Sequence, residues 1–323
     1  MKTLSMKKPG SDAFSTTKNS SKRMSKKLKN KIVFWSFLAP VLFSFVMVMV
    51  IPFLLGVYYS FTNWDGINPA EFNGLTNYIN IFSDDKKFLY AVFVTCIYTV
   101  LNIIVINLVS FSLAMLVTRE LKLQNLYRVG FFVPNLIGGL ILGYIWQFIY
   151  KSVIPGFGVT LGLESLASSN MLASNDLALM ALVITGTWQY AGYIMMIYVT
   201  ALQNVPKDLI EAAQIDGASA WQRMKNITLP LVAPAFTITL FLTLVNSFKQ
   251  FDVNVSLTAG GPSTLFMGEA LNGTELLALN IYNEAFVNRN MALGQAKAIL
   301  FFIALLIVSL IQVYINKRKE VEM

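Results

Sequence analysis

The chain alternates long apolar runs with shorter polar stretches. A helix needs about 20 mainly apolar residues to cross a bilayer core of roughly 30 Å. Six runs meet this length, at residues 33–58, 91–117, 128–150, 178–203, 231–256 and 295–315. Proline occurs inside three of them, at Pro40, Pro52, Pro134 and Pro234, which transmembrane helices tolerate better than soluble ones. We therefore predict an all-helical (all-α) membrane protein with six transmembrane helices.

Basic residues predict which side of the membrane each loop occupies. About ten of the 25 Lys and Arg precede Ile32, in a Ser/Lys-rich segment that we interpret as a solvated, disordered tail. If this tail is cytoplasmic, nine further basic residues lie on the same side, which makes about 19 of the 25. These nine are Arg119, Lys122, Arg128, Lys207, Arg223, Lys225, Lys317, Arg318 and Lys319. Cytoplasmic loops carry such an excess. We predict cytoplasmic termini, with tails at 1–32 and 317–323 around a six-helix domain at 33–316.

Composition supports a membrane protein and argues against several kinds of site. The chain is 55% hydrophobic and 13% charged, with a mean hydropathy of +0.59, typical of a polytopic membrane protein. No folded basic module follows the tail, so its charge does not indicate nucleic-acid binding. Cys96 is the single cysteine, and there is neither histidine nor a GxxxxGK[ST] phosphate loop. We expect no metal or cofactor in this chain and no ATP hydrolysis by it.

The loop at 204–230 has a soluble-looking pattern between two membrane-grade runs. Pro206 and Asp208 suit the start of a helix, Gly217 suits its end, and Ser219 suits the start of a second helix. Leu209, Ile210 and Ala213 are expected to form a short apolar face. The characteristic residues are Glu211, Ala212, Ala213, Gly217, Ile227, Leu229 and Pro230. A simpler interpretation is an amphipathic helix lying on lipid headgroups.

With this loop the chain resembles the permease subunits of binding-protein-dependent ABC importers, which carry the same EAA pattern. Among these it is similar to the sugar permeases akin to the maltose and glycerol-3-phosphate permeases. The resemblance covers nearly everything from Phe34 onward and includes Ala201-Leu202-Gln203, Asp216-Gly217-Ala218, Leu257 to Pro262, Tyr282 to Phe286, and Leu293 to Ala296. The chain departs from the family at 267–279, which is longer than usual, and at Lys297, where we expect a small residue.

The resemblance implies a mechanism and a set of partners. The loop would form a coupling helix docked into a separate ATPase subunit, which would hold the ATP and Mg²⁺. The contact would involve Glu211, Ala212, Ala213, Asp216 and Gly217. A second permease, a pair of ATPase subunits and an extracytoplasmic sugar-binding protein are implied as partners, and the bacterial cell membrane as the location.

Polar residues inside two predicted spans suggest a substrate path. In the fifth span, Asn246, Lys249, Gln250 and Asn254 have the spacing of one helix face, and Asp252 is placed to pair with Lys249. The fourth span offers Gln189, Tyr190 and Tyr193. Amides and a lysine suit sugar hydroxyls, tyrosine rings suit the apolar face of a pyranose, and the resemblance points to the same positions. Alternatively, these groups bond neighbouring helices.

We expect an importer subunit for carbohydrate, specifically an oligosaccharide, with three rivals. The same importer for a phosphorylated polyol or an acidic sugar is compatible with Lys249. An ion-coupled secondary transporter would need paired acids within the spans, and only Asp252 is a candidate. A membrane scaffold without transport would tolerate Glu211→Ala.

Overall fold

The computed structural model describes residues 26–119 and 122–317 and is helical over most of that length. It divides into two compact units at the boundary between Leu54 and Leu55. In the first unit, α1 (Lys26–Phe45) and a π-helical turn (Val46–Val50) continue into the first residues of α2 (Ile51–Tyr59). α1 thus begins inside the segment predicted to be a tail. The rest of both predicted tails, 1–25 and 318–323, lies outside the described residues.

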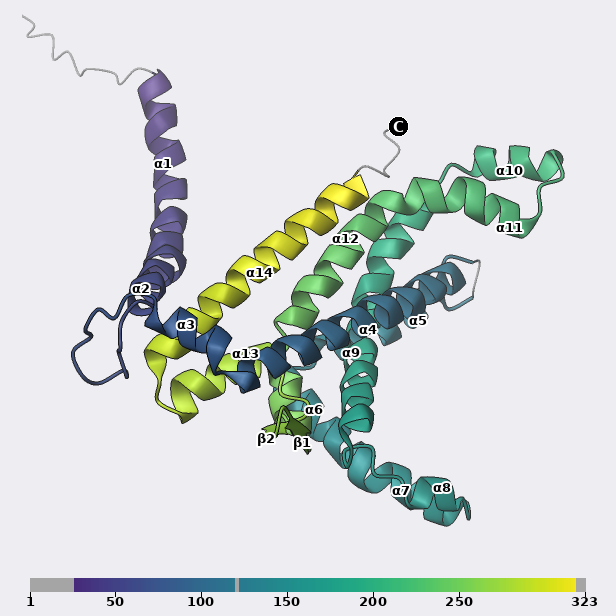
Figure 1. The fold of residues 1–323 in the computed structure, drawn as a ribbon. Helices are drawn as coiled ribbons and strands as arrows, with labels where there is room; N and C mark the ends of the chain where they lie inside the picture. Colours follow the sequence, from purple (N-terminus) through teal and green to yellow (C-terminus); the bar gives the residue numbers. More distant parts are fainter. Residues whose placement is uncertain (1–25, 120–121, 318–323) are drawn as a thin grey trace, which may run out of the picture. The chain divides into compact units, whose positions relative to one another are not determined.

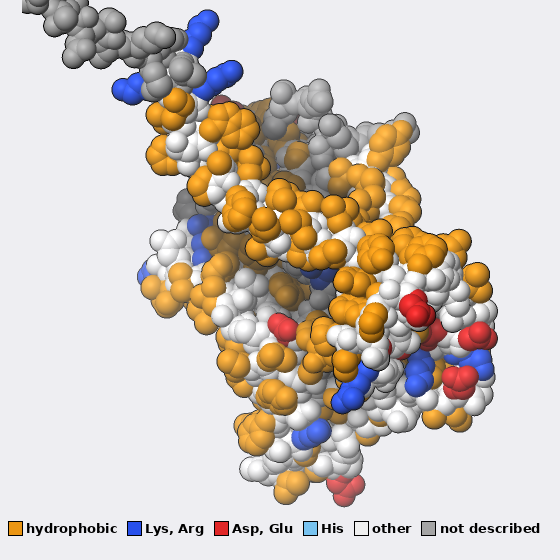
Figure 2. Space-filling model, turned by 90° about the vertical axis from the view of Figure 1, so that its left-hand side faces the viewer, with side chains coloured by type: hydrophobic (Ala, Val, Ile, Leu, Met, Phe, Trp, Pro, Cys, Tyr) orange, Lys and Arg blue, Asp and Glu red, His pale blue; other side chains and the backbone are white. Residues whose placement is uncertain are grey.

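Four long helices form the body of the second unit (Figure 1). α4 packs on α9 and α12, and α12 also packs on α9 and α14. Their bounds are α4 (Lys86–Val117), α9 (Asn175–Gln203), α12 (Leu229–Phe248) and α14 (Met291–Lys317). Each belongs to a helix long and apolar enough to cross a membrane, as does the helix that ends with α2. Much of the face in Figure 2 is apolar, as expected of helices that contact lipid.

The third predicted span, 128–150, is broken rather than straight. Its two halves, 124–136 and 139–160, meet at 99°, and they bring the number of candidate spans to six if they cross as one. Ile137 and Gly138 adopt extended backbone between them. Pro134 contributes to the break because it supplies no N–H for a helical hydrogen bond. The segment comprises α5 (Gln124–Phe132), a 3-10 turn (Val133–Leu136), α6 (Gly139–Phe148), a π turn (Ile149–Val153) and α7 (Ile154–Thr160).

The fifth predicted span, 231–256, is also wrong at its C-terminal end. α12 stops at Phe248, residues 249–251 are not helical, and a separate π-helical turn, η5, covers Asn254–Thr258. Its N-terminal end starts earlier than predicted, since the helix runs continuously from Ala220. The break lets η5 turn onto α6, where a Cβ on Gly143 would overlap Ser256 Oγ. Close packing between these segments therefore replaces helix continuation.

The segments at the end of the second unit opposite α10 and α11 include a small β-hairpin, so the chain is not entirely helical (Figure 1). β1 (Ser263–Phe266) pairs antiparallel with β2 (Glu269–Asn272). This hairpin occupies part of the stretch that is longer than usual for the resembled family. The other short elements here are α3 (Thr76–Ser83), α8 (Glu164–Ala167), α13 (Leu277–Tyr282) and the π turn η6 (Asn283–Val287).

Candidate functional site

The loop between α9 and α12 contains a short helix, α10 (Lys207–Ile215), that ends in a glycine-dependent cap. The N–H of Gly217 donates to Gln214 O at 3.0 Å, and the N–H of Ala218 donates to Ala213 O at 2.9 Å. This pair of bonds is a Schellman motif, which requires a left-handed residue after the helix. Gly217 fills that position with a φ of +78°. The helix end predicted at Gly217 is therefore present in the structure.

The second helix of the loop begins as the sequence predicted. The Ser219 side chain accepts a hydrogen bond from the N–H of Gln222 at 3.3 Å, and the Gln222 side chain accepts from the N–H of Ser219 at 2.7 Å. This reciprocal capping box fixes the start of α11 (Ala220–Arg223). α11 continues through η4 (Met224–Thr228) into α12, so any movement of the loop is connected directly to a long helix.

The loop presents most of its side chains to the surroundings. Ile210 packs against the apolar cluster formed by α4, α9 and α12, whereas Leu209, which was predicted to share that face, is 47% exposed. Ile215 and Trp221 are 87% and 71% exposed. Glu211, Ala212, Asp216 and Gly217 are exposed too, and Ala213 is half-buried. The residues of the EAA pattern thus lie on an open surface that includes large apolar side chains.

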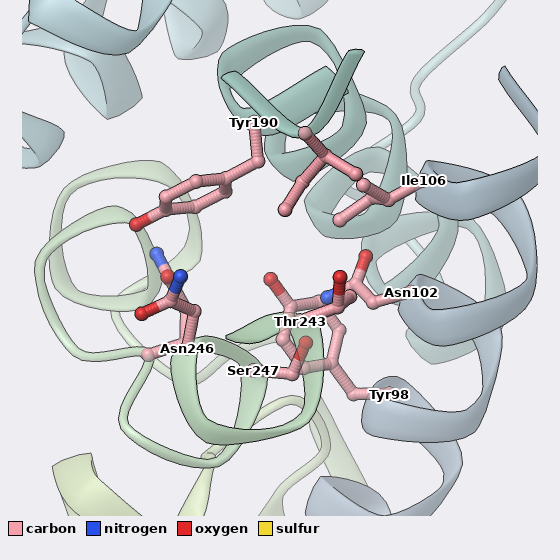
Figure 3. A pocket seen from close by; sticks show the side chains of 9 residues that line it. Tyr98, Asn102, Ile106, Tyr190, Thr243, Asn246 and Ser247 are labelled. Carbon is pink, nitrogen blue, oxygen red and sulfur yellow. The ribbon is translucent and has the colours of Figure 1, made fainter. Parts of the chain in front are cut away.

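A polar cavity lies between α4, α9 and the end of α12 (Figure 3). The cavity is narrow in this conformation: its volume for the centre of a water-sized sphere is about 10 Å³, which is room for about one water molecule. Tyr190 reaches across the cavity, and its hydroxyl points toward Asn246 (Figure 3). The lining side chains are Tyr98, Asn102, Ile106, Tyr190, Ile194, Thr243, Asn246, Ser247 and Gln250. Most of them carry an amide or a hydroxyl, which makes this a hydrogen-bonding cavity inside an apolar bundle.

One lining residue has a buried acceptor that the protein itself does not satisfy. Asn102 is 2% exposed, and its Oδ1 has no hydrogen-bond partner within the described residues. Thr99 lies three positions earlier on α4, and its buried Oγ1 also has no hydrogen-bond partner within the described residues. A buried polar atom without a partner costs about 1–3 kcal/mol. Because Asn102 lines the cavity, its Oδ1 indicates a place where water or a ligand supplies the missing donor.

A neighbouring polar network, by contrast, is closed within the protein. Tyr198 donates to Asn107 Oδ1 at 2.8 Å and accepts from Thr239 Oγ1 at 2.7 Å. Asn107 Nδ2 donates to Ile103 O at 2.8 Å and to Thr243 Oγ1 at 3.3 Å. These bonds join α4, α9 and α12. Asn107 therefore has a structural role on the helix that also carries Asn102.

The substrate-path residues predicted from the sequence divide into two groups. Tyr190, Asn246 and Gln250 line the cavity, whereas Gln189, Tyr193 and Lys249 do not. Gln189 Nε2 donates to Ile137 O at 3.2 Å, across the break in the third span. Tyr193 belongs to a groove beside α5. The predicted stripe on the fifth span is wrong because the helix ends between its members.

Asn254, the last residue of that stripe, has a role that the spacing did not reveal. Asn254 Nδ2 donates to Thr274 O at 2.8 Å and Asn254 Oδ1 accepts from the N–H of Leu276 at 3.0 Å, so it fixes the loop between η5 and α13. Lys249 and Asp252 are both exposed and do not form an ion pair among the described residues.

Sequence reasoning missed the part of the cavity that comes from α4. Tyr98 and Asn102 are four residues apart and thus share one helix face, a signal that an inspection of the second span would have found. Thr243 and Ser247 have the same spacing on α12. Within residues 26–119 and 122–317, no group of three or more His, Cys, Asp or Glu is arranged to hold a metal.

Comparison with solved structures establishes the fold. A bacterial ABC transporter involved in the import of the acidic polysaccharide alginate has a chain that superposes with a TM-score of 0.76. The match covers 91% of this chain and 98% of the other at 18% identity. At that identity the likeness concerns the fold alone.

Comparison of sequences establishes the family. Residues 106–321 match the model described as "Binding-protein-dependent transport system inner membrane component". The probable starch degradation products transport system permease protein AmyD of Thermoanaerobacterium thermosulfurigenes is 46% identical, over 93% of this chain and 99% of the relative. The multiple sugar-binding transport system permease protein MsmF of Streptococcus mutans is 31% identical, over 92% and 99%. The predicted resemblance is confirmed: this chain belongs to the family of binding-protein-dependent transport system inner membrane components, multi-pass proteins of the bacterial inner membrane.

Proposed function

We propose that the chain forms one half of the translocation path of an ATP-driven importer for an oligosaccharide. The observation that carries this proposal is the polar cavity inside the bundle, lined by Asn102, Tyr190, Asn246 and Gln250. Amides and hydroxyls bond sugar hydroxyls, and a tyrosine ring contacts the apolar face of a pyranose. The names of AmyD and MsmF, which refer to starch degradation products and to multiple sugars, support the same class of cargo.

The exposed charges at the end of α12 support a second membrane half. Lys249 follows an apolar helix directly and is exposed in the single chain. A lysine in the hydrocarbon region costs about 2.5–3.5 kcal/mol or more. Lys249 and the exposed Asp252 therefore belong on a water-filled path or against another subunit. We propose that a second permease closes the path on this side, and that Lys249 lies on its rim.

A cargo with a negative charge is the second candidate, and Lys249 is the observation that favours it. Lys249 directly precedes Gln250 in the sequence, and Gln250 lines the cavity. A phosphorylated polyol or an acidic sugar would pair with this lysine, whereas a neutral oligosaccharide would only accept hydrogen bonds from it. Competition of labelled maltodextrin uptake by neutral and anionic sugars distinguishes the two cargo classes.

We propose that the loop at 204–230 is the coupling loop and that α10 docks into an ATPase subunit, which binds the ATP and Mg²⁺. The exposed Ile215 and Trp221 support this role, because large apolar side chains on a membrane protein's polar loop suit a protein partner. The loop and both termini are then cytoplasmic, and an extracytoplasmic binding protein delivers the sugar at the opposite end. Glu211 and Gly217 would form part of the ATPase contact.

The path is tested by transport of labelled maltodextrins into proteoliposomes that contain the complete importer. Asn246→Ala removes an amide from the cavity and should lower the uptake rate without changing assembly. Asn125→Ala is the matched control, since Asn125 is exposed on α5, outside both the cavity and the loop at 204–230. Equal uptake by both variants would exclude the cavity from the path.

The coupling loop is tested separately by Glu211→Lys. Glu211 is exposed on α10, so its replacement should leave the protein inserted and folded. It should nevertheless abolish uptake and reduce the amount of ATPase that copurifies with the membrane subunits. Normal uptake by this variant would refute the coupling role.

A further inference from the structure

A fully buried lysine lies near the start of α14, outside the cavity and the coupling loop. Lys297 is 0% exposed. Its Nζ lies 2.6 Å from Asp85 Oδ2 and 2.8 Å from Glu284 Oε2, and it donates to Asn280 Oδ1 at 3.5 Å. An ammonium has three N–H groups. All three therefore have an acceptor, and the acceptors come from three different segments of the chain.

Asp85 and Glu284 also hold the backbone near them, Asp85 through its carboxylate and Glu284 through its main-chain carbonyl. Asp85 is the N-cap of α4, and its Oδ1 accepts from the N–H of Phe88 at 2.8 Å. Glu284 lies in η6, where its backbone O accepts from the N–H of Asn290 at 3.1 Å, just before α14 begins. Lys297 thus connects the first turn of α4 with η6 and with the first turns of its own helix.

The place of Lys297 on α14 makes this connection important for the helix as a whole. The fully buried residues of α14 among 291–315 are Ala292, Gly294, Ala296 and Lys297, all within its first two turns. From residue 298 to residue 315 every residue is half-buried or exposed. The outer end of α14 is therefore where the helix is most firmly held, and the buried ammonium is at the centre of that end.

The surroundings make the ion pairs costly to break. An apolar cluster including Ile81, Phe88, Leu277 and Ala296 packs around the site, and Nζ lies 5.7 Å from the centre of the Phe88 ring. Removing one partner of a buried ion pair leaves the other charge uncompensated in a medium of low polarity. Here a single lysine balances two carboxylates, so its removal leaves two negative charges side by side.

We propose that Lys297 is a positioning residue for transport, which makes α14 and η6 move together with α4. α4 lines the cavity through Tyr98 and Asn102, whereas α14 contributes no residue to it. A fixed connection at the outer end gives α14 a defined orientation whenever α4 changes position, as rigid-body movement of packed helices requires. This role rests on the proposed transport function, but the geometry of the connection does not depend on the cargo.

The experiment uses the assembled importer with two variants of Lys297. Lys297→Met keeps an unbranched side chain only one atom shorter but removes its charge. It should lower the uptake of labelled maltodextrin roughly tenfold, within the range of single residues in a coupling network. Lys297→Met combined with Glu284→Gln also removes one of the unpaired carboxylates. This double variant should recover thermal stability but not uptake, because the charge is relieved while the connection remains absent.

Lys86→Met is the matched control. Its ammonium pairs with Glu269 at 2.9 Å at the same end of the molecule, but its side chain is 37% exposed. Exposed ion pairs contribute little, so uptake by this variant should be unchanged. If the double variant recovered both stability and uptake, Lys297 would merely neutralise its neighbours, and the positioning role would be overturned.

A distance measurement tests the connection without reference to transport. The single native cysteine is first removed by Cys96→Ser. Spin labels are then attached at Leu108→Cys in α4 and Ile303→Cys in α14, where the native side chains are 65% and 47% exposed. Lys297→Met should broaden or shift the distribution of distances between the labels, and Lys86→Met should not. An unchanged distribution in Lys297→Met would refute the proposal. Failure of the unsubstituted importer to take up maltodextrin would instead refute maltodextrin as its cargo and leave the distance test of Lys297 unaffected.

Discussion

Two asparagines on α4 offer a direct separation of transport from folding. Asn102 and Asn107 are five residues apart and 2% and 7% exposed. Asn102 borders the cavity with an acceptor that has no partner, whereas Asn107 takes part in three hydrogen bonds to α4, α9 and α12. The same replacement by Leu, which has the same number and branching of side-chain heavy atoms as Asn, should therefore lower stability far more at Asn107 than at Asn102.

The magnitudes follow from these bonds. Asn107→Leu removes three bonds worth roughly 0.6–1 kcal/mol each within a membrane bundle, and should destabilise the protein by about 2–3 kcal/mol. Asn102→Leu removes an unsatisfied acceptor but also the hydrogen bond between the Asn102 side chain and Tyr98, so the two effects offset and stability should change little. If Asn102 bonds a sugar hydroxyl, loss of about 0.5–1.5 kcal/mol should raise the KM of uptake about 2- to 13-fold.

Both quantities are measured on the same purified importer. Thermal stability is followed as the fraction that remains monodisperse after heating in detergent, and KM is followed by maltodextrin uptake into proteoliposomes. The reasoning fails if Asn102→Leu is as unstable as Asn107→Leu, because Asn102 would then be a structural residue. It also fails if the Asn102 variant transports with unchanged KM, because the cavity would then not bind the cargo.

Three further predictions concern positions with a single clear feature. Gly143→Ala places a Cβ against Ser256 and should lower stability in the heating assay by about 1–3 kcal/mol. Gly138→Ala is the control and should be neutral, because nothing lies within 4 Å of the added Cβ. Equal stabilities of the two variants would contradict the close packing of α6 and η5. Lys249→Ala should slow uptake while the ATPase still copurifies, and unchanged kinetics would make this lysine irrelevant to the path. Gly217→Ala puts a side chain at a φ of +78°, which costs about 1 kcal/mol at the end of α10. This variant should therefore copurify with less ATPase. Full retention of the ATPase would show that the helix cap is not needed for docking.

Hydropathy and local signals in the sequence predicted the elements whose cause is local. The five long apolar helices, the helix end at Gly217 and the capping box at Ser219 depend on residues close together in the chain, and the structure contains them. The EAA pattern likewise identified the family from residues within one loop. Glu211 and its neighbours remain a prediction as an ATPase contact, because that contact requires a partner.

The tertiary structure alone decided which polar residues meet and where the long helices break. In a membrane, both the lipid-facing and the protein-facing sides of a helix are apolar, so hydropathy does not identify the face that lines a cavity. Tyr98 and Asn102 join Asn246 only because α4 packs beside α12. α12 ends at Phe248, and the residues that follow pack on α6 through η5, a contact that the sequence of α12 does not specify. Lys297 is the clearest case, because its two carboxylates come from segments 212 and 13 residues away in the chain, and only the folded chain brings the three charges together.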